Sequence, residues 1–296
     1  MLSILIPVYN YDVTALVDEL HQQGLAGNSP FEILCFDDGS EARYKATNKA
    51  INHCESVTYN ELTQNVGRSK IRNLLAEAAQ FKYLLFMDCD SKVVGPDYLK
   101  NYVERLKTDT LLYGGRCYQE EAPKDANLML HWKYGREREA KSAVQRTLNP
   151  YHSFMTNNFL IPKKLFDAIK FDESLLQYGH EDTLFGLELL KRSIPIVHFD
   201  NPLEHTGLEQ SIVFLNKTKQ ALENLSALYS KNKGIETRLL SYYHQLQRVG
   251  LYHLLSPLNL MAGHLIHNNL ISSNPSLFLF DLFKLIQLNQ INKRKS

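Results

Sequence analysis

The stretch KYLLFMDCDSK, residues 82–92, decides the fold because it joins a continuous apolar run to two carboxylates. Residues 83–87 are apolar at every position, which is typical of a strand covered on both faces in a parallel sheet. Asp88 and Asp90 follow two positions apart, so in an extended segment their side chains point the same way. Ligands of open parallel sheets bind beyond the carboxyl ends of the strands. The stretch therefore predicts an α/β sheet with an acidic site at a strand end.

Two earlier apolar runs alternate with helical patterns in the same way. Residues 2–9 (LSILIPVY) and 31–38 (FEILCFDD) are typical of buried strands, whereas residues 13–24 and 68–80 carry apolar side chains at helical spacing. The alternation predicts a βαβαβ unit with a parallel sheet. From about residue 212 the pattern is helical. Between these parts, residues 110–118 and 157–166 are typical of strand and turn segments, and residues 194–199 of a further strand. Residues 173–192 are typical of a loop that leads into a helix.

Composition limits the classes of partner. The chain has 296 residues with 33 Lys+Arg and 32 Asp+Glu, and its net charge of +1 gives no electrostatic case for nucleic acid. The opening MLSILIPVYN has no basic segment and no small-residue cleavage site, so we expect no secretory signal. The four cysteines show no metal-type CxxC spacing, which favours reduced thiols in a cytoplasm; they are Cys35, Cys54, Cys89 and Cys117.

A second strand also ends in acids. The run CFDDGS places Asp37 and Asp38 before a Gly-Ser turn, beside the expected position of Asp88 and Asp90. Carboxylates gathered at one edge need a counter-charge, and a divalent cation is the simplest one. The alternative is structural: the acids of both pairs solvate strand ends or form turns through side-chain to backbone hydrogen bonds.

Six short motifs occur in a fixed order that resembles glycosyltransferase family 2, the inverting nucleotide-sugar enzymes of the GT-A fold. They are IPVYN (6–10), DDGS (37–40), NVGRSKIRN (65–73), DCD (88–90), NNFLIPKKLF (157–166) and GHED (179–182). The resemblance covers about residues 1–210. It implies a Rossmann-like, mostly parallel sheet with helices on both faces, to which the sequence adds a helical C-terminal extension.

The resemblance also implies where a nucleotide-sugar binds, and UDP is the expected nucleotide. The nucleotide would contact the ends of the first two strands and a helix start, at Pro7, Val8, Tyr9, Asp37, Asp38, Gly67 and Arg68. Asp37 is the alternative to Asp38 as the partner of the base, and Arg68 is either a ligand of the base or diphosphate or a solvated first-turn residue. Asp88 would bind the nucleotide, and Asn158, with Asn157, would line the sugar and acceptor pocket or else serve in a turn.

For the metal, the resemblance implies Asp90 and a histidine after the catalytic acid. NPLEHTG offers His205, with His198 and His180 as rivals. Oxygen ligands suit Mg²⁺ or Mn²⁺, and an imidazole favours Mn²⁺. The family pattern makes Asp182 the general base toward an acceptor hydroxyl and Glu181 the group that orients the acceptor. The alternative is that both acids only stabilise the start of a helix through its dipole.

Two later segments leave alternatives open. Residues 120–157 are polar and locally helical, as a lid or acceptor surface would be, and Trp132 either stacks on a sugar or anchors packing. Residues 249–280 contain no Asp, Glu, Lys or Arg. Polar residues and a proline interrupt the run, which argues against a membrane-spanning helix. The run either packs on the catalytic domain, forms an oligomer interface, or rests on a membrane.

The sequence thus predicts a catalytic domain over residues 1–210 and a helical extension over 211–296. Residues 1–100 form its nucleotide-binding half and 101–210 its acceptor half. We expect an inverting, metal-dependent transferase acting on a glycan or a lipid-linked acceptor, in the cytoplasm or on the inner face of the membrane, with homo-oligomerisation left open. The alternatives are a nucleotide-sugar-binding module without turnover and a nucleotidyltransferase; the latter would want a glycine-rich phosphate loop after the first strand, which IPVYNYDV lacks.

Overall fold

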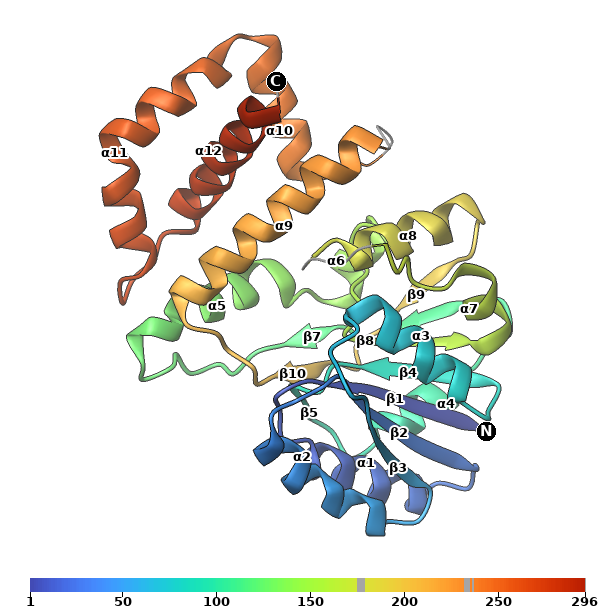
Figure 1. Ribbon diagram of the computed structural model, residues 1–296. Helices are drawn as coiled ribbons and strands as arrows, with labels where there is room; N and C mark the ends of the chain where they lie inside the picture. The colour runs from blue at the N-terminus through green and yellow to red at the C-terminus, as the bar shows by residue number, and fades with distance from the viewer. Residues whose placement is uncertain (175–178, 232–234, 236, 296) are drawn as a thin grey trace. The chain divides into compact units, whose positions relative to one another are not determined.

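The computed structural model describes residues 1–174, 179–231, 235 and 237–295. The chain divides into two compact units, coloured along the chain in Figure 1. The sheet unit comprises Met1–Tyr118, Ala140–Leu176 and Glu181–Gly207, and the helical unit comprises Gln119–Glu139, Gln177–His180 and Leu208–Ser296. Residues 119–139, which the sequence analysis placed in the acceptor half, therefore group with the C-terminal helices.

A seven-stranded sheet forms the sheet unit, which confirms the predicted α/β class. The spatial order is β3 (Val57–Glu61), β2 (Phe31–Asp37), β1 (Leu2–Val8), β4 (Tyr83–Met87), β8 (Asn158–Pro162), β6 (Leu111–Tyr113) and β9 (Ile196–His198). Neighbouring strands are parallel except that β8 runs antiparallel to both β4 and β6. The register pairs Val8 with Asp37, so the carboxyl ends of β1 and β2 meet at one edge of the sheet.

Alternating side chains of β1 contribute to two cores, one on each face of the sheet. Ile4 and Ile6 of β1 belong to the core that includes Val17 and Leu20, whereas Leu5 belongs to the core on the other face. This explains why the strands are continuously apolar, since both faces are covered. The helices of the unit are α1 (Thr14–Ala26), α2 (Ala42–Asn48), α3 (Arg68–Ala78), α4 (Tyr98–Val103), α6 (Ala143–Thr147), α7 (Lys163–Ile169) and α8 (Glu181–Lys191), with a 3₁₀ turn η1 (Lys49–His53).

A second, three-stranded sheet follows the end of β4. Its order is β5 (Ser91–Val93), β10 (Leu203–His205) and β7 (Arg116–Cys117). The antiparallel pairing of β5 with β10 sets His205 opposite Ser91. The segment expected as strand and turn at residues 110–118 contains β7, whereas β5 and β10 were not predicted, because they are too short for a periodic signal. They bring segments more than one hundred residues apart in sequence to the same place.

Helices make up the other unit. They are η2 (Ala126–Leu128), α5 (Met129–Tyr134), the π-helix η3 (Gly135–Glu139), α9 (Ser211–Lys231), α10 (Arg238–Arg248), η4 (Leu251–Leu254), α11 (Leu255–Leu270) and α12 (Leu277–Lys295). The ring of Phe214 stacks on His131 and Phe280, and Tyr134 packs edge-on against Phe280. These rings tie α5 to α9 and α12. No helix among the described residues is both long and apolar enough to cross a membrane.

Trp132 on α5 is held within the helical unit. Its indole N–H donates to the carbonyl of Gln119 at 2.9 Å, and the guanidinium of Arg136 lies 5.5 Å from the ring centroid. The same carbonyl accepts a hydrogen bond from Arg136. Of the two roles considered for Trp132, these contacts are those of a packing anchor.

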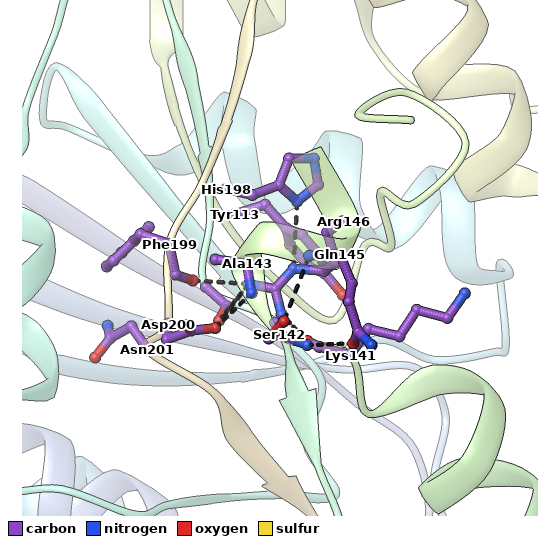
Figure 2. Close-up of polar contacts among 12 residues, drawn as sticks. Tyr113, Lys141, Ser142, Ala143, Gln145, Arg146, His198, Phe199, Asp200 and Asn201 are labelled. Atoms are coloured by element: carbon purple, nitrogen blue, oxygen red, sulfur yellow. Dashed lines mark hydrogen bonds and ion pairs between the residues drawn. The ribbon is translucent and has the colours of Figure 1, made fainter. Parts of the chain in front are cut away.

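A buried arginine locks α6 to the ends of β6 and β9. Arg146 donates to the carbonyl oxygens of Lys141, Gly114 and Phe199, and its Nε donates to Nδ1 of His198 at 3.3 Å (Figure 2). Since a guanidinium only donates, Nδ1 of His198 must accept, and the ring proton sits on Nε2, 3.0 Å from the carbonyl of Pro150. Both ring nitrogens of His198, which the sequence offered as an alternative to His205 as metal ligand, therefore make structural contacts.

We expect His198 to make folding sensitive to acid. The pKa of His198 is lowered to about 4, mainly by burial; the hydrogen bond to the Pro150 carbonyl opposes the shift, and the nearby Arg146 adds to it. Because the folded pKa lies below the usual value near 6.5, the stabilisation is complete above pH 6.5 and is lost as pH falls toward 4. At pH 5 the loss should reach about 2 kcal/mol, on the basis of about 1.4 kcal/mol per pH unit for one proton.

Urea unfolding at pH 7.5 and pH 5 tests this expectation. His198→Gln should lose less stability between the two pH values than the wild type, because the variant has no imidazole to protonate. His53→Gln, at an exposed histidine, is the matched control and should behave as the wild type. An equal loss in His198→Gln and the wild type would assign the acid sensitivity to other groups.

Candidate active site

Two arginines hold the first acid of the DCD motif. Asp88 Oδ1 accepts from Nη2 of Arg72 at 2.6 Å, and Oδ2 accepts from Nη2 of Arg116 at 3.2 Å. Both guanidinium groups are largely buried, with exposed side-chain fractions of 4% and 11%. The sequence analysis missed both arginines, although Arg72 lies one helical turn after Arg68 within the NVGRSKIRN motif. The charge of Asp88 is thus matched by the protein itself.

The second acid of the motif faces a histidine. Asp90 Oδ1 lies 3.4 Å from Nδ1 of His205, and the two side chains reach this position through the pairing of β5 with β10. Residues 89 and 90 form a turn, so the expected alternation of an extended segment is wrong here. Asp88 turns to the arginines while Asp90 turns to His205. The sequence prediction that Asp90 and His205 belong to one site remains compatible with this geometry.

The environment of Asp90 is tightly built. The backbone N–H and the hydroxyl of Thr206 both donate to the Asp90 carbonyl at 2.9 Å, and the Thr206 hydroxyl also contacts the Tyr11 hydroxyl. A Cβ on Gly207 would lie 2.5 Å from Asp90 Oδ2, so glycine is required there for the carboxylate to keep its place. Sequence reasoning missed Gly207, which directly follows His205 and Thr206 in the NPLEHTG segment.

Charge keeps Asp90 ionised. Burial alone would raise the pKa of Asp90, but His205, Arg116 and Arg68 outweigh burial and hold the pKa well below its usual range. Oδ1 is buried and accepts no hydrogen bond from the described residues, since 3.4 Å to His205 is long for one. An ionised oxygen without a hydrogen bond, beside an imidazole nitrogen, suits a divalent cation.

The protein offers few ligands for such a cation. Within the described residues, no three His, Cys, Asp or Glu side chains come together in a way that could hold a metal ion. A cation at Asp90 and His205 would therefore complete its coordination with oxygens from elsewhere, as Mg²⁺ commonly does with substrate phosphates.

The two acids of the DDGS motif, Asp37 and Asp38, accept hydrogen bonds from groups within the protein. Asp37 is fully buried and accepts from the N–H of Ser40 and the hydroxyl of Tyr59, both at 2.7 Å. Asp38 accepts from the N–H of Val66 at 2.6 Å and of Gly67 at 3.1 Å. Burial raises the pKa of Asp38, and the two N–H groups partly offset this rise. The N–H groups of the loop before α3, which were expected to bind an anionic ligand, therefore donate to the side chain of Asp38.

Gly67 shapes that loop. Its φ of +89° and ψ of 162° lie in a region that only glycine adopts readily. A Cβ at this position would meet no neighbouring atom within 4 Å, so the space in front of the loop is open on the protein's side. Backbone conformation, not crowding by the protein, explains the glycine.

The end of β1 is hydrogen-bonded to the DDGS turn that follows β2. The carbonyl of Val8 accepts from the N–H of Asp38 at 2.8 Å, and Val8 is fully buried. Pro7 is half-buried, whereas Tyr9 is 52% exposed. Of these three predicted nucleotide contacts, Tyr9 is therefore the most exposed.

An ion pair joins the start of α3 to the start of α8. Arg68 Nη1 lies 3.4 Å from Glu181 Oε1. Burial would raise the pKa of Glu181, but Arg68 and Arg72 outweigh burial and lower it. Asp182 follows on the first turn of α8, half-buried, and its Oδ1 accepts from the N–H of Thr183 at 2.7 Å. His180, before the pair, has a left-handed φ of +71°.

Residues 3–169, more than half of the chain, match the sequence family described as glycosyl transferase family 2. The chain belongs to glycosyl transferase family 2. No curated protein sequence matches it significantly.

Solved structures of GT-A glycosyltransferases share the fold. A mannosyltransferase from Pyrobaculum calidifontis, PcManGT, solved with GDP-Man and Mn²⁺, is similar with a TM-score of 0.52 and 13% identity over 78% of this chain. S. aureus TarS 1–349, solved with UDP-GlcNAc, has a TM-score of 0.51 and 16% identity over 99% of this chain and 91% of its own. At these identities the likeness shows the GT-A fold alone.

This chain covers different shares of the lengths of these structures. The chain spans 38% of a longer TarS chain, with a TM-score of 0.49, and 64% of PcManGT. The predicted family and fold are confirmed, while the residues of the site remain predictions.

One predicted sugar contact, Asn158, lies beside the end of β4, but its side chain is engaged in the core. Asn158 is fully buried; its Oδ1 accepts from the hydroxyls of Tyr98 and Tyr102, and its Nδ2 donates to the carbonyls of Gly115 and Asn201. The neighbouring Asn157 is also buried and accepts from the Tyr113 hydroxyl at 3.2 Å. Both asparagines serve the core, so we do not carry Asn158 forward as a sugar contact.

Proposed function

We propose that the chain is an inverting, metal-dependent glycosyltransferase that moves a sugar from a nucleotide-sugar to a hydroxyl of a glycan or lipid-linked acceptor. The observation that carries this proposal is the convergence of Asp90 and His205 beside the arginine-held Asp88, at the carboxyl end of β4 in a family 2 chain. UDP is the expected nucleotide. TarS 1–349 bound to UDP-GlcNAc supports a UDP-sugar donor, and PcManGT bound to GDP-Man keeps GDP as the alternative.

For donor binding we assign the exposed ring of Tyr9 to the base, with Pro7 and Val8 as the wall behind it. Asp38 would hold the open loop at Gly67 in place, and Asp37 would support the turn. Asp88 would meet the ribose or sugar, with Arg72 and Arg116 balancing its charge. Arg68, half-exposed and already next to Glu181, could exchange this partner for the diphosphate.

Asp90 and His205 are the residues that would hold Mn²⁺ or Mg²⁺, and the imidazole favours Mn²⁺. When bound, the cation would act as a Lewis acid that offsets charge developing on the leaving nucleotide. Gly207 and Thr206 would keep the Asp90 carboxylate and its backbone in position.

Asp182 is our candidate base. With Oδ1 fixed by the N–H of Thr183, Oδ2 would take the proton of the acceptor hydroxyl as its oxygen forms a bond to the anomeric carbon. The bond from that carbon to the diphosphate breaks on the opposite side, which inverts the configuration. Glu181, kept ionised by Arg68 and Arg72, would orient the acceptor hydroxyl.

Incubation with a panel of UDP- and GDP-sugars and Mn²⁺ tests the reaction class. We expect nucleotide diphosphate release with one donor, dependent on a divalent cation and faster when a suitable acceptor is added. Nucleotide-sugar binding without release across acceptors would instead support the binding module. Pyrophosphate release from a nucleoside triphosphate and a sugar phosphate would support the nucleotidyltransferase.

A further inference from the structure

One face of α11 exposes large apolar side chains to solvent. Residues at helical spacing share this face, and we call their apolar members the α11 stripe: Leu254, which is the last residue of η4, and Pro257, Leu260, Met261 and Leu265 of α11. Leu260 is 86% exposed and Met261 84%. Leu255, Ile266 and Leu270, which are buried, lie on the opposite side of the helix. That side packs on α12, which runs beside α11 in Figure 1.

Basic residues outnumber acids in the segment that carries the stripe. The stripe lies within residues 249–280, which contain no charged side chain. Between residues 237 and 295 the sole acid is Asp281, and Arg138 and Lys284 pair with it at 3.0 and 2.7 Å. Against this one acid the same segment carries three lysines and three arginines.

Cations border the stripe at its N-terminal end. Lys293 Nζ contacts the hydroxyl of Ser256, in the first turn of α11, at 2.8 Å. Arg248 ends α10 just before the exposed Val249 and Leu251. Both cations are exposed. Apolar side chains exposed on a helix, with cations nearby and a single, already paired acid in the segment, match an anionic bilayer surface.

We propose that the α11 stripe docks the protein on an anionic lipid surface, with the apolar residues entering the interface and Arg248 and Lys293 contacting lipid phosphates. A second copy of the chain is a poorer occupant, because the stripe holds no carboxylate that could pair with the bordering cations of that copy. The inference is independent of catalytic activity.

Vesicle flotation with the full chain tests the proposal. We expect binding to vesicles of phosphatidylcholine plus phosphatidylglycerol, weaker binding to phosphatidylcholine alone, and a decrease with salt. The double variant Leu260→Ser/Met261→Ser should weaken binding at least about tenfold, since it removes the two most exposed apolar side chains of the stripe. Arg248→Gln and Lys293→Gln should each weaken binding to the anionic vesicles roughly fivefold.

The matched control is Val144→Ser/Leu148→Ser, which removes two apolar side chains that are 76% and 77% exposed on the sheet unit. It should bind as the wild type does. Thermal melting of every variant checks that folding is retained, as expected for such exposed positions. The proposal is overturned if neither vesicle is bound, or if Leu260→Ser/Met261→Ser binds like the control. It is also overturned if the stripe variant converts a wild-type dimer to a monomer, which would make a second copy the occupant.

Discussion

Asp182→Asn is expected to lower sugar transfer by about 10²–10⁴-fold, the usual contribution of a general base. The amide keeps nearly the same shape and still accepts a hydrogen bond from Thr183, but it cannot take a proton from the acceptor. The carboxylate is removed without touching Asp90, His205 or the loop held by Asp38. Affinity for UDP and Mn²⁺ should therefore stay within a few-fold of the wild type.

The measurement is steady-state transfer beside calorimetric titration with UDP, for Asp182→Asn and Glu181→Gln. Glu181→Gln loses the ion pair with Arg68 and should act mainly by raising the KM for the acceptor. Asp167→Asn, at an exposed position of α7, is the matched control and should transfer at the wild-type rate. Retention of more than about a tenth of the wild-type rate in Asp182→Asn would mean that another group is the base. The two acids would then only stabilise the start of α8.

The strong sequence signals concern the strands that carry the site. The runs at 2–9, 31–38 and 83–87 predicted β1, β2 and β4, because strands covered on both faces must be continuously apolar. The second and third of these runs end in acids, although Asp37 is itself fully buried. The βαβαβ alternation then limits the topology to a parallel sheet, which the structure confirms for these strands.

Contacts that are decided by long-range packing were not predicted from the sequence. No local pattern marks β5 and β10, whose pairing sets His205 near Asp90. The partners of Asp88 were missed because Arg72 and Arg116 come from a helix and a two-residue strand. Asn158 was a plausible pocket residue by motif, but Tyr98 and Tyr102 take up its side chain in the core. Such pairings are set by tertiary packing, which a single sequence does not encode locally.

The grouping of residues 119–139 shows the same limit. Their polar, charged sequence suggested a lid or an acceptor surface. What places them with the C-terminal helices is the packing of His131 and Tyr134 against Phe214 and Phe280. These contacts span about 80 to 150 positions of sequence, and rings at such distances leave no periodic signal.

Asp90→Asn is expected to weaken Mn²⁺-supported UDP binding by at least about 100-fold, beyond the 10–100-fold typical of outer-shell partners of a metal. The reason is the small number of protein ligands: the site offers one carboxylate and one imidazole, so losing the negative charge leaves only His205. His205→Gln should have a smaller effect, roughly tenfold, because the anionic ligand remains. UDP titration with Mn²⁺ and with EDTA measures both effects without needing a donor sugar.

Gly207→Ala separates the position of the carboxylate from its charge. The new Cβ would lie 2.5 Å from Asp90 Oδ2, so the side chain has to move while staying ionised. Mn²⁺-supported UDP binding should fall, and the binding that persists in EDTA should not change. Asp97→Asn, at a carboxylate that is 62% exposed and outside the site, controls for the loss of one negative charge. If Asp90→Asn keeps the Mn²⁺ dependence of the wild type, the cation does not bind at Asp90, and the pairing with His205 is purely structural.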